Sequence, residues 1–208
     1  VVTVNHYDAL GSRVGQTDAR GNTTTYVYDY LGRLEASISA GGVAHTQGYD
    51  EYGRVVTTTD GLGAETITAY DGLGRRATVT DPEGHVTAYA YDGLGNQVQI
   101  TDPKSQITKY EYDDLNRLIA VTENYSDTGP SDHQTNVLTQ YLHDALGNRT
   151  VITDANGTVT TFDYDRVNRL ETIDYADTTP DVSFTYDQAG NRLPTTLRTR
   201  SPQPTAPW

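Results

Sequence analysis

Polar and apolar side chains alternate along most of the chain, which is the period of a β-strand with two unlike faces. Aromatic residues two apart share a face in five of the predicted strands: Tyr26/Tyr28, Tyr89/Tyr91, Tyr110/Tyr112, Phe162/Tyr164 and Phe184/Tyr186. The returning strands place aliphatic residues on a second common face: Val56, Ala77, Val79, Val98, Ile100, Ile119, Val121, Ile152 and Ile173. Helical periodicity is not evident, so the pattern predicts an all-β chain.

A repeat of 21 residues organises these strands. Each unit carries a tyrosine followed by an aspartate, with histidine replacing tyrosine once: Tyr7-Asp8, Tyr28-Asp29, Tyr49-Asp50, Tyr70-Asp71, Tyr91-Asp92, Tyr112-Asp113, His143-Asp144, Tyr164-Asp165 and Tyr186-Asp187. The step is 31 residues before His143 and 22 before Tyr186. Nine units with one insertion therefore account for nearly the whole sequence.

Glycine or asparagine follows four residues after each of these tyrosine positions: Gly11, Gly32, Gly53, Gly74, Gly95, Asn116, Gly147, Asn168 and Gly190. Asparagine is the residue that most readily replaces glycine where φ is positive. Aspartate at the start and a left-handed residue three positions later are typical of a type I turn followed by a bulge residue. Each Tyr-Asp motif is therefore predicted to end one strand and begin the next.

A second turn occurs halfway through the unit, with aspartate and usually glycine three residues apart: Asp18/Gly21, Asp60/Gly63, Asp81/Gly84, Asp102/Ser105 and Asp154/Gly157. Pro82 and Pro103 occupy the turn position that needs φ near −65°. Two turns per unit leave two strands of about six residues. The predicted fold is a series of tandem antiparallel β-hairpins.

The organisation expected from these patterns is one repeat array over residues 1–200. Residues 122–137 hold the insertion and have loop composition, which predicts an elongated hairpin loop. Residues 201–208 contain three prolines in eight positions and are expected to form a linker or tail. The chain begins with valine, lacks methionine and shows no signal peptide, so we expect it to be a piece of a longer protein.

Composition narrows the function classes. The net charge of −13 disfavours nucleic-acid binding, because phosphates would be repelled. The absence of cysteine excludes disulfides and thiolate metal sites or nucleophiles. No apolar run approaches the ~20 residues that a membrane-spanning helix requires, so membrane insertion is not expected.

The repeat units resemble those of the Rhs/YD-repeat family, in which Tyr-Asp-x-x-Gly-Arg-Leu alternates with Thr-Asp-Pro-x-Gly-x-x-Thr. Tyr28-Asp-Tyr-Leu-Gly-Arg-Leu34 and Thr80-Asp-Pro-Glu-Gly-His-Val-Thr87 match these motifs almost residue for residue. The resemblance covers roughly residues 5–193. It implies a hairpin sheet that spirals, solenoid-like, into a hollow shell, as in bacterial polymorphic toxins, the C component of insecticidal toxin complexes and teneurins.

In the toxins of this family the shell holds a cytotoxic C-terminal domain, so the resemblance implies two partners: the rest of a parent shell and an encapsulated toxin domain. It also implies secretion or a cell-surface location, in a bacterium. The chain lacks the shell-closing core segment with its self-cleavage end and any distinct domain after the repeats. Nine units are too few for a closed shell, which implies an open segment.

Catalytic, metal and cofactor sites are not expected. No nucleophile elbow, phosphate loop or paired-carboxylate signature occurs. The repeated aspartates lack the spacing of calcium loops and suit turn chemistry. The histidines show no metal-ligand spacing: His6, His45, His85, His133 and His143.

Two functions remain open. One is a non-catalytic structural segment of a secreted shell. The alternative is a cell-surface recognition module, carbohydrate-binding or adhesive, or a self-assembling fibre segment, because aromatic ladders can stack on sugars. The apolar strand at Val1 to Val4 has no leading charge or proline, so its edge is expected to pair with another chain.

Overall fold

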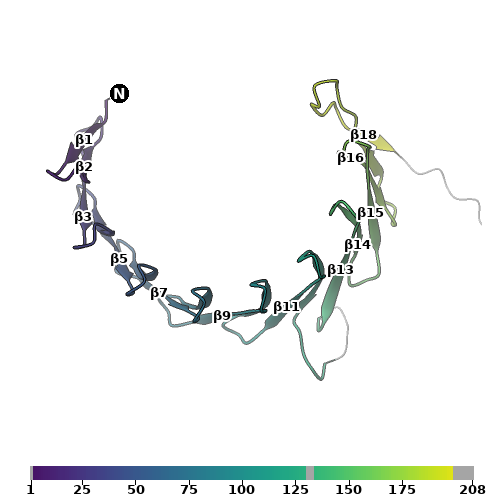
Figure 1. The fold of residues 1–208 in the computed structure, drawn as a ribbon, viewed down its shortest axis with the longest axis horizontal. Helices are drawn as coiled ribbons and strands as arrows, with labels where there is room; N and C mark the ends of the chain where they lie inside the picture. The colour runs from purple at the N-terminus through teal and green to yellow at the C-terminus, as the bar shows by residue number, and fades with distance from the viewer. Residues whose placement is uncertain (1, 130–133, 199–208) are drawn as a thin grey trace, which may run out of the picture. The chain divides into compact units, whose positions relative to one another are not determined.

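The computed structural model describes residues 2–129 and 134–198. Eighteen strands and no helix are found in this part of the chain (Figure 1). The chain divides into two compact units, Val1–Tyr89 and Ala90–Trp208. The division falls inside β9 (Val86–Tyr91).

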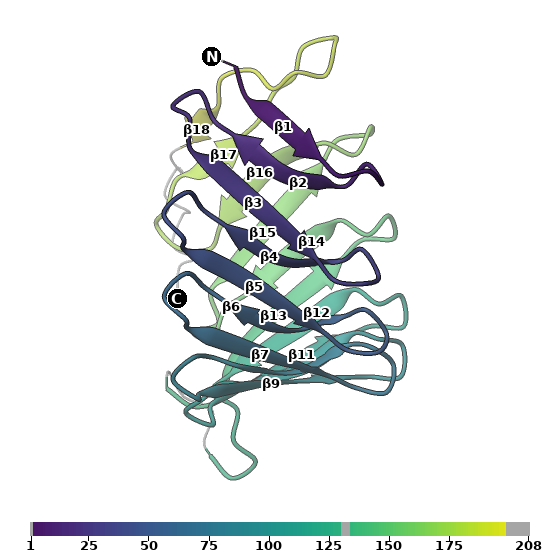
Figure 2. The same cartoon turned by 90° about the vertical axis from the view of Figure 1, so that its left-hand side faces the viewer.

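In the first unit each strand pairs antiparallel with the next one along the chain. The strands before β9 are β1 (Val4–Tyr7), β2 (Arg13–Thr17), β3 (Thr23–Tyr28), β4 (Leu34–Ile38), β5 (Ala44–Tyr49), β6 (Val55–Thr59), β7 (Glu65–Tyr70) and β8 (Arg76–Thr80). This order places all Tyr-Asp turns of the unit along one edge of the sheet and the second turns along the opposite edge (Figure 2).

The second unit has the same sequential antiparallel pairing from β10 to β18. Its strands are β10 (Gln97–Thr101), β11 (Ile107–Tyr112), β12 (Leu118–Glu123), β13 (Val137–His143), β14 (Arg149–Thr153), β15 (Val159–Tyr164), β16 (Leu170–Tyr175), β17 (Asp181–Ser183) and β18 (Thr196–Arg198). The prediction of an all-β chain of tandem antiparallel hairpins in an open sheet is confirmed.

The two kinds of hairpin differ in register. Across a Tyr-Asp turn Tyr28 faces Leu34 while Val27 faces Ala36, so the returning strand carries one extra residue. The second hairpins show no such shift, as in β2–β3, where Gly15, Gln16 and Thr17 face Thr25, Thr24 and Thr23. A bulge increases the local twist of a strand pair, and the sheet therefore receives one such distortion in each regular Tyr-Asp hairpin.

A packed core is almost absent from the described residues, among which only Ala120 and Phe184 count as buried apolar residues. β10 is half-buried on both faces, whereas in other strands one face is half-buried and the other exposed. In β7, for example, Tyr70 lies on the half-buried face, while Glu65, Ile67 and Ala69 are exposed. The sheet is a single layer, and contacts between neighbouring hairpins provide its stability.

The expectation of a separate aliphatic face is wrong. Val121 lies directly opposite Tyr110, and Ile152 lies opposite Tyr141. Directly opposed residues of an antiparallel pair project from the same face. The aliphatic residues of the returning strands therefore pack beside the aromatic rings and share their face.

The ninth unit departs from the regular hairpin. Its entering strand β17 stops at Ser183, and Tyr186 and Arg192 form only an isolated bridge. The chain then returns as β18, which pairs with β17. Pro194 has no backbone N–H to donate to a neighbouring strand, which accounts for the interrupted pairing between Arg192 and β18.

The insertion lies between β12 and β13, which pair antiparallel, and its residues 130–133 lie outside the described residues. Asn136 donates its backbone N–H to the Asn124 carbonyl at 3.1 Å, and both residues have positive φ. The Asn136 side chain also accepts the N–H of Ser126 at 2.8 Å and donates to the Gly129 carbonyl at 3.0 Å. The predicted tail at 201–208 lies outside the described residues.

Candidate functional site: the tyrosine-aspartate turns

Each Tyr-Asp turn is closed by two backbone hydrogen bonds. In the third unit the N–H of Gly53 donates to the Asp50 carbonyl, and the N–H of Asp50 donates to the Arg54 carbonyl, both at 3.0 Å. The same two bonds occur in all nine units. The structure places the residue four after each tyrosine position in the left-handed region, with φ between 60° and 93°: Gly11, Gly32, Gly53, Gly74, Gly95, Asn116, Gly147, Asn168 and Gly190.

The aspartate carboxylate stabilises its own turn through hydrogen bonds. Oδ1 of Asp50 accepts the backbone N–H groups of Tyr52 and Arg54 at 2.9 Å each, and Oδ2 accepts Nε of Arg54 at 2.6 Å. Five units form such an aspartate-arginine pair: Asp29/Arg33, Asp50/Arg54, Asp71/Arg75, Asp113/Arg117 and Asp165/Arg169. Asn96, Asn148 and Asn191 take the arginine's place in three others and also donate to Oδ2.

The arginine extends this network to the next unit. The Arg33 guanidinium lies 4.4 Å from the centroid of the Tyr49 ring, and its NH1 group donates to the Asp50 carbonyl at 3.3 Å. The corresponding distances are 4.5 Å for Arg54 over Tyr70 and 4.2 Å for Arg169 over Tyr186. A cation over an aromatic face is attracted to it, so these arginines connect consecutive turns.

The tyrosine hydroxyl makes the second link between units. It donates to the carbonyl of the first residue of the preceding returning strand, 15 or 16 residues earlier. The donor and acceptor pairs are Tyr28/Arg13, Tyr49/Leu34, Tyr70/Val55, Tyr112/Gln97, Tyr164/Arg149 and Tyr186/Leu170, at 2.7 to 3.1 Å. Within each unit, aspartate, arginine and tyrosine thus link consecutive hairpins through these contacts, which are called the turn ladder below.

Sequence reasoning found the tyrosines, aspartates and glycines of the turn ladder, but it assigned no role to the arginine that the Tyr-Asp-x-x-Gly-Arg-Leu motif contains. Arg33, Arg54, Arg75, Arg117 and Arg169 recur directly after the left-handed residue, and this recurrence was the available signal. Sequence reasoning also missed the turn at Ser39. There the Ser39 hydroxyl, in place of an aspartate carboxylate, accepts the N–H of Val43 at 3.2 Å. The Gly41-Gly42 pair could have marked that turn.

The RHS Repeat family model matches residues 7–44, 49–86, 70–107, 91–128 and 143–180. These matches cover most of the sequence. The chain belongs to the RHS-repeat family. The resemblance drawn from the Tyr-Asp motifs is therefore confirmed, and the matches end before the irregular ninth unit.

Solved structures with the same fold come from toxin complexes. The crystal structure of TcdB2-TccC3-TEV has a TM-score of 0.58 at 19% identity over 96% of this chain. A mutant Photorhabdus luminescens Tc holotoxin pore has a TM-score of 0.57 at 18% identity over 96% of this chain. This chain spans only 14% and 13% of those two chains. A comparison with curated protein sequences finds no match.

His143 is the exception among the RHS-repeat tyrosines. Its shorter side chain has a buried Nδ1 atom without a hydrogen-bond partner in the described structure. Arg117 of the preceding unit still donates to the Asp144 carbonyl at 2.8 Å.

We expect His143→Tyr to stabilise the chain by about 1 kcal/mol, because a tyrosine hydroxyl would regain one hydrogen bond and the unpartnered nitrogen would be removed. Urea unfolding of the two proteins measures the difference. The same substitution at the exposed His45 is the control and should change stability little. A destabilised His143→Tyr protein would show that the histidine is favourable in its site.

The aspartates of the second to ninth Tyr-Asp turns, from Asp29 to Asp187, have lowered pKa values. Hydrogen bonds from the Arg117 side chain and then its backbone N–H lower the pKa of Asp113, while partial burial acts in the opposite direction. At Asp71 the largest cause of the lowered pKa is the hydrogen bond from the Arg75 backbone N–H. The folded state therefore holds these carboxylates ionised at a pH where the unfolded chain takes up protons.

Stability should consequently be constant above about pH 5 and fall as the pH drops below about 4 through the lowered pKa values. Chemical unfolding at a series of pH values measures this. Asp71→Asn keeps an oxygen acceptor but cannot titrate, so its stability should fall less steeply in acid. Equal acid slopes for the two proteins would contradict the assignment.

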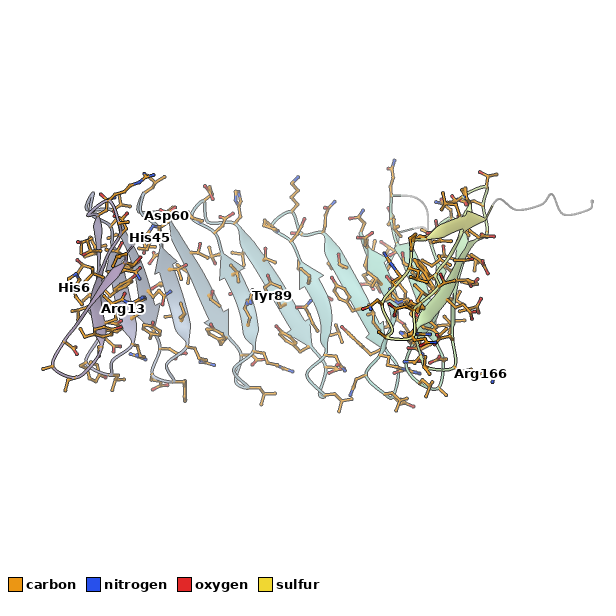
Figure 3. All side chains as sticks on the ribbon, turned by 90° about the horizontal axis from the view of Figure 1, so that it is seen from above. His6, Arg13, His45, Asp60, Tyr89 and Arg166 are labelled. Atoms are coloured by element: carbon orange, nitrogen blue, oxygen red, sulfur yellow. The ribbon has the colours of Figure 1, made fainter. Side chains whose placement is uncertain are left out.

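Three potential metal ligands lie together in one of the second turns. Atoms of Asp81, Glu83 and His85 lie within 4.8 Å of one another. The Asp81 carboxylate already accepts the backbone N–H groups of Glu83 and His85 and contacts the His85 ring at 2.9 Å. The cluster therefore has the hydrogen bonds of an ordinary second turn. His45 lies near Asp60 at the same edge (Figure 3).

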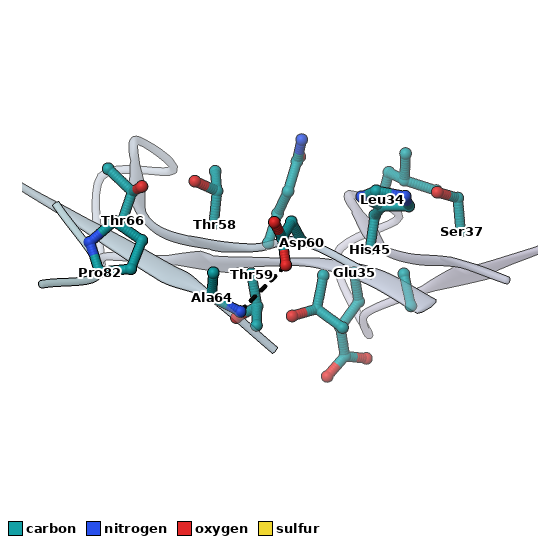
Figure 4. Close-up of a pocket in the computed structure, with 13 residues that line it drawn as sticks. Leu34, Glu35, Ser37, His45, Thr58, Thr59, Asp60, Ala64, Thr66 and Pro82 are labelled. Atoms are coloured by element: carbon teal, nitrogen blue, oxygen red, sulfur yellow. Dashed lines mark hydrogen bonds between the residues drawn. The ribbon is translucent and has the colours of Figure 1, made fainter. Parts of the chain in front are cut away.

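One hollow of the first unit measures about 320 Å³ and is lined mainly by residues of β4 to β7. Its lining includes the consecutive residues Thr58 and Thr59, which point to alternate faces of a strand. Figure 4 shows Thr58 and Glu35 on opposite sides of the ribbon. The hollow is a space around a single-layer sheet and has no convergent catalytic groups.

Proposed function

We propose that this chain is a non-catalytic structural segment in the wall of a large secreted bacterial shell, of the kind that encloses a toxin domain. The observation that carries the proposal is the turn ladder, in which the polar groups of the repeat motif bind one another. Asp50, for instance, uses both carboxylate oxygens within its own turn. These polar groups stabilise the contacts between hairpins and are not free to react with a substrate.

Belonging to the RHS-repeat family and sharing a fold with chains of Tc complexes both support this proposal. The small share of those chains that this sequence spans supports a larger parent, whose remaining repeats and enclosed domain would be the partners. None of the described residues belongs to a helix with the length and apolarity that a membrane crossing needs.

An antibody against this chain tests the proposal in the source cells. It should detect a polypeptide much longer than 208 residues, outside the cytoplasm, in a particle that protects part of its mass from added protease. A free cytoplasmic protein of 208 residues, or complete digestion by the protease, would contradict the proposal.

Carbohydrate recognition is the second candidate. A hollow of about 440 Å³ in the second unit combines the aromatic residues Tyr110 and Tyr112 with Asn96, Asn116 and Asp113. Aromatic faces with amide and carboxylate groups suit a sugar ring. Binding on a glycan array that Tyr110→Ser abolishes would support this candidate, and an array without signal would rule it out.

Self-association through the N-terminal strand is a further part of the proposal. All four residues of β1 are exposed, and within the described residues β1 pairs only with β2. Its outer edge can therefore add a strand from another chain. The strand begins at Val4, while Val2 and Thr3 are outside it and Val1 lies outside the described residues. Sedimentation of the chain with and without residues 1–4 tests the idea, and a monomer in both cases would refute it.

A further inference from the structure

Large apolar side chains stand at the tips of the Tyr-Asp turns in the first unit. The residue before each left-handed glycine is Leu10, Leu31, Tyr52 or Leu73, and the exposed fractions are 92%, 60%, 75% and 77%. These four residues form the tip row. The second unit carries its own equivalent set, Leu94, Leu115, Leu146 and Val167. Scattered exposed leucines need no explanation, but a regular row of them marks an interaction surface.

The opposite edge of the first unit lacks such a row. The same position in its second turns is held by Arg20, Gly41, Leu62 and Glu83. Only Leu62 is a large apolar residue, with an exposed fraction of 95%. The turn geometry is the same at both edges, since each turn is closed by the same pair of backbone bonds. The apolar tips are therefore a property of one edge and not a requirement of the turn.

Charge also distinguishes the two edges. At the tip-row edge Asp29, Asp50 and Asp71 each form an ion pair with an arginine of the same turn, at 2.6 to 2.7 Å. The fourth aspartate of this edge, Asp8, binds only backbone N–H groups. At the opposite edge no arginine or lysine pairs with a turn aspartate of the described residues: Asp60 binds backbone N–H groups, and Asp81 contacts the His85 ring. Two tip-row edges can approach each other without the repulsion expected for a chain of net charge −13.

We propose that the tip row is an interface for a second copy of this chain. Successive tips are separated by two strands, or about 9.5 Å, so an occupant must present apolar groups at that spacing. The tip row of a second copy has this spacing and the same compensated charge. A two-fold pairing of the rows covers the leucines of both copies with one self-complementary surface. This contact joins turn tips and is distinct from strand addition at β1.

Sedimentation equilibrium of the full chain tests the proposal over protein concentrations of about 1 to 100 µM. The wild-type chain should dimerise, and Leu31→Asn with Leu73→Asn should weaken the dimer at least about tenfold, because buried anchor residues dominate interfaces. Asparagine suits this turn position, and circular dichroism and thermal melting confirm that the variant folds.

Leu62→Asn is the matched control, since it removes an even more exposed leucine from the same turn position at the opposite edge. It should leave the tip-row dimer unchanged, and so should deletion of residues 1–4, which removes only association through the β1 edge. A wild-type monomer at every concentration overturns the proposal. A dimer that survives the double substitution also overturns the proposal, because its contact would lie at β1 or at the tips of the second unit. A dimer that Leu62→Asn weakens equally overturns it as well, because its contact would involve the opposite edge.

Discussion

Replacing Gly95 by valine should lower the free energy of unfolding by about 2 to 3 kcal/mol, whereas replacing it by asparagine should cost about 1 kcal/mol or less. Gly95 has a φ of 93°, and a side chain added there would meet no atom within 4 Å. The loss at valine therefore reports backbone strain and not a clash. Asn116 and Asn168 hold the equivalent position with φ of 60° and 68°.

Urea unfolding followed by circular dichroism compares the two Gly95 variants with the wild-type chain. Gly93→Val is the control, because Gly93 lies in the same turn without a positive φ and also faces open space. Its effect should be smaller than that of Gly95→Val. Equal losses for valine and asparagine at Gly95 would contradict the left-handed requirement at this position of the repeat.

Replacing Tyr70 by alanine should cost about 2 to 4 kcal/mol, since the half-buried ring is lost together with its contacts. The Tyr70 hydroxyl donates to the Val55 carbonyl at 2.9 Å, and the Arg54 guanidinium lies 4.5 Å from the ring centroid. Tyr70→Phe removes only the hydroxyl and should cost about 1 kcal/mol.

Tyr7→Phe is the matched control for Tyr70→Phe. Tyr7 holds the same repeat position, is 60% exposed and makes no hydroxyl hydrogen bond within the described residues. Its substitution should leave stability unchanged within about 0.5 kcal/mol. If Tyr70→Phe lowers the free energy of unfolding no more than Tyr7→Phe does, the hydroxyl hydrogen bond between units contributes nothing to stability.

The regular part of the fold could be predicted from local patterns. Two-residue alternation indicates strands, and the exchange of glycine for asparagine at Asn116 and Asn168 indicates a positive φ. Both signals are contained within a few residues. Strand order then followed from the turns, because a short turn can only join antiparallel neighbours.

Contacts between units could not be read in the same way. Arg33 contacts Tyr49, sixteen residues further along the chain, and Tyr49 in turn bonds the Leu34 carbonyl. These partners meet only once the hairpins are stacked in register. The bulge in each regular Tyr-Asp hairpin, which decides which residues share a face, was likewise set by pairing between strands.

The turn ladder is the central claim, and a double-mutant cycle on Arg54 and Tyr70 tests it most directly. Unfolding free energies of Arg54→Gln, Tyr70→Phe, Tyr70→Ala and the double variants give the coupling between the two side chains. We predict a coupling of about 0.5 to 2 kcal/mol with alanine at position 70. The pair Arg33 and Tyr70, for which no contact exists in the ladder, should show none. A coupling for Arg54 and Tyr70 no larger than that of the control pair would contradict the account.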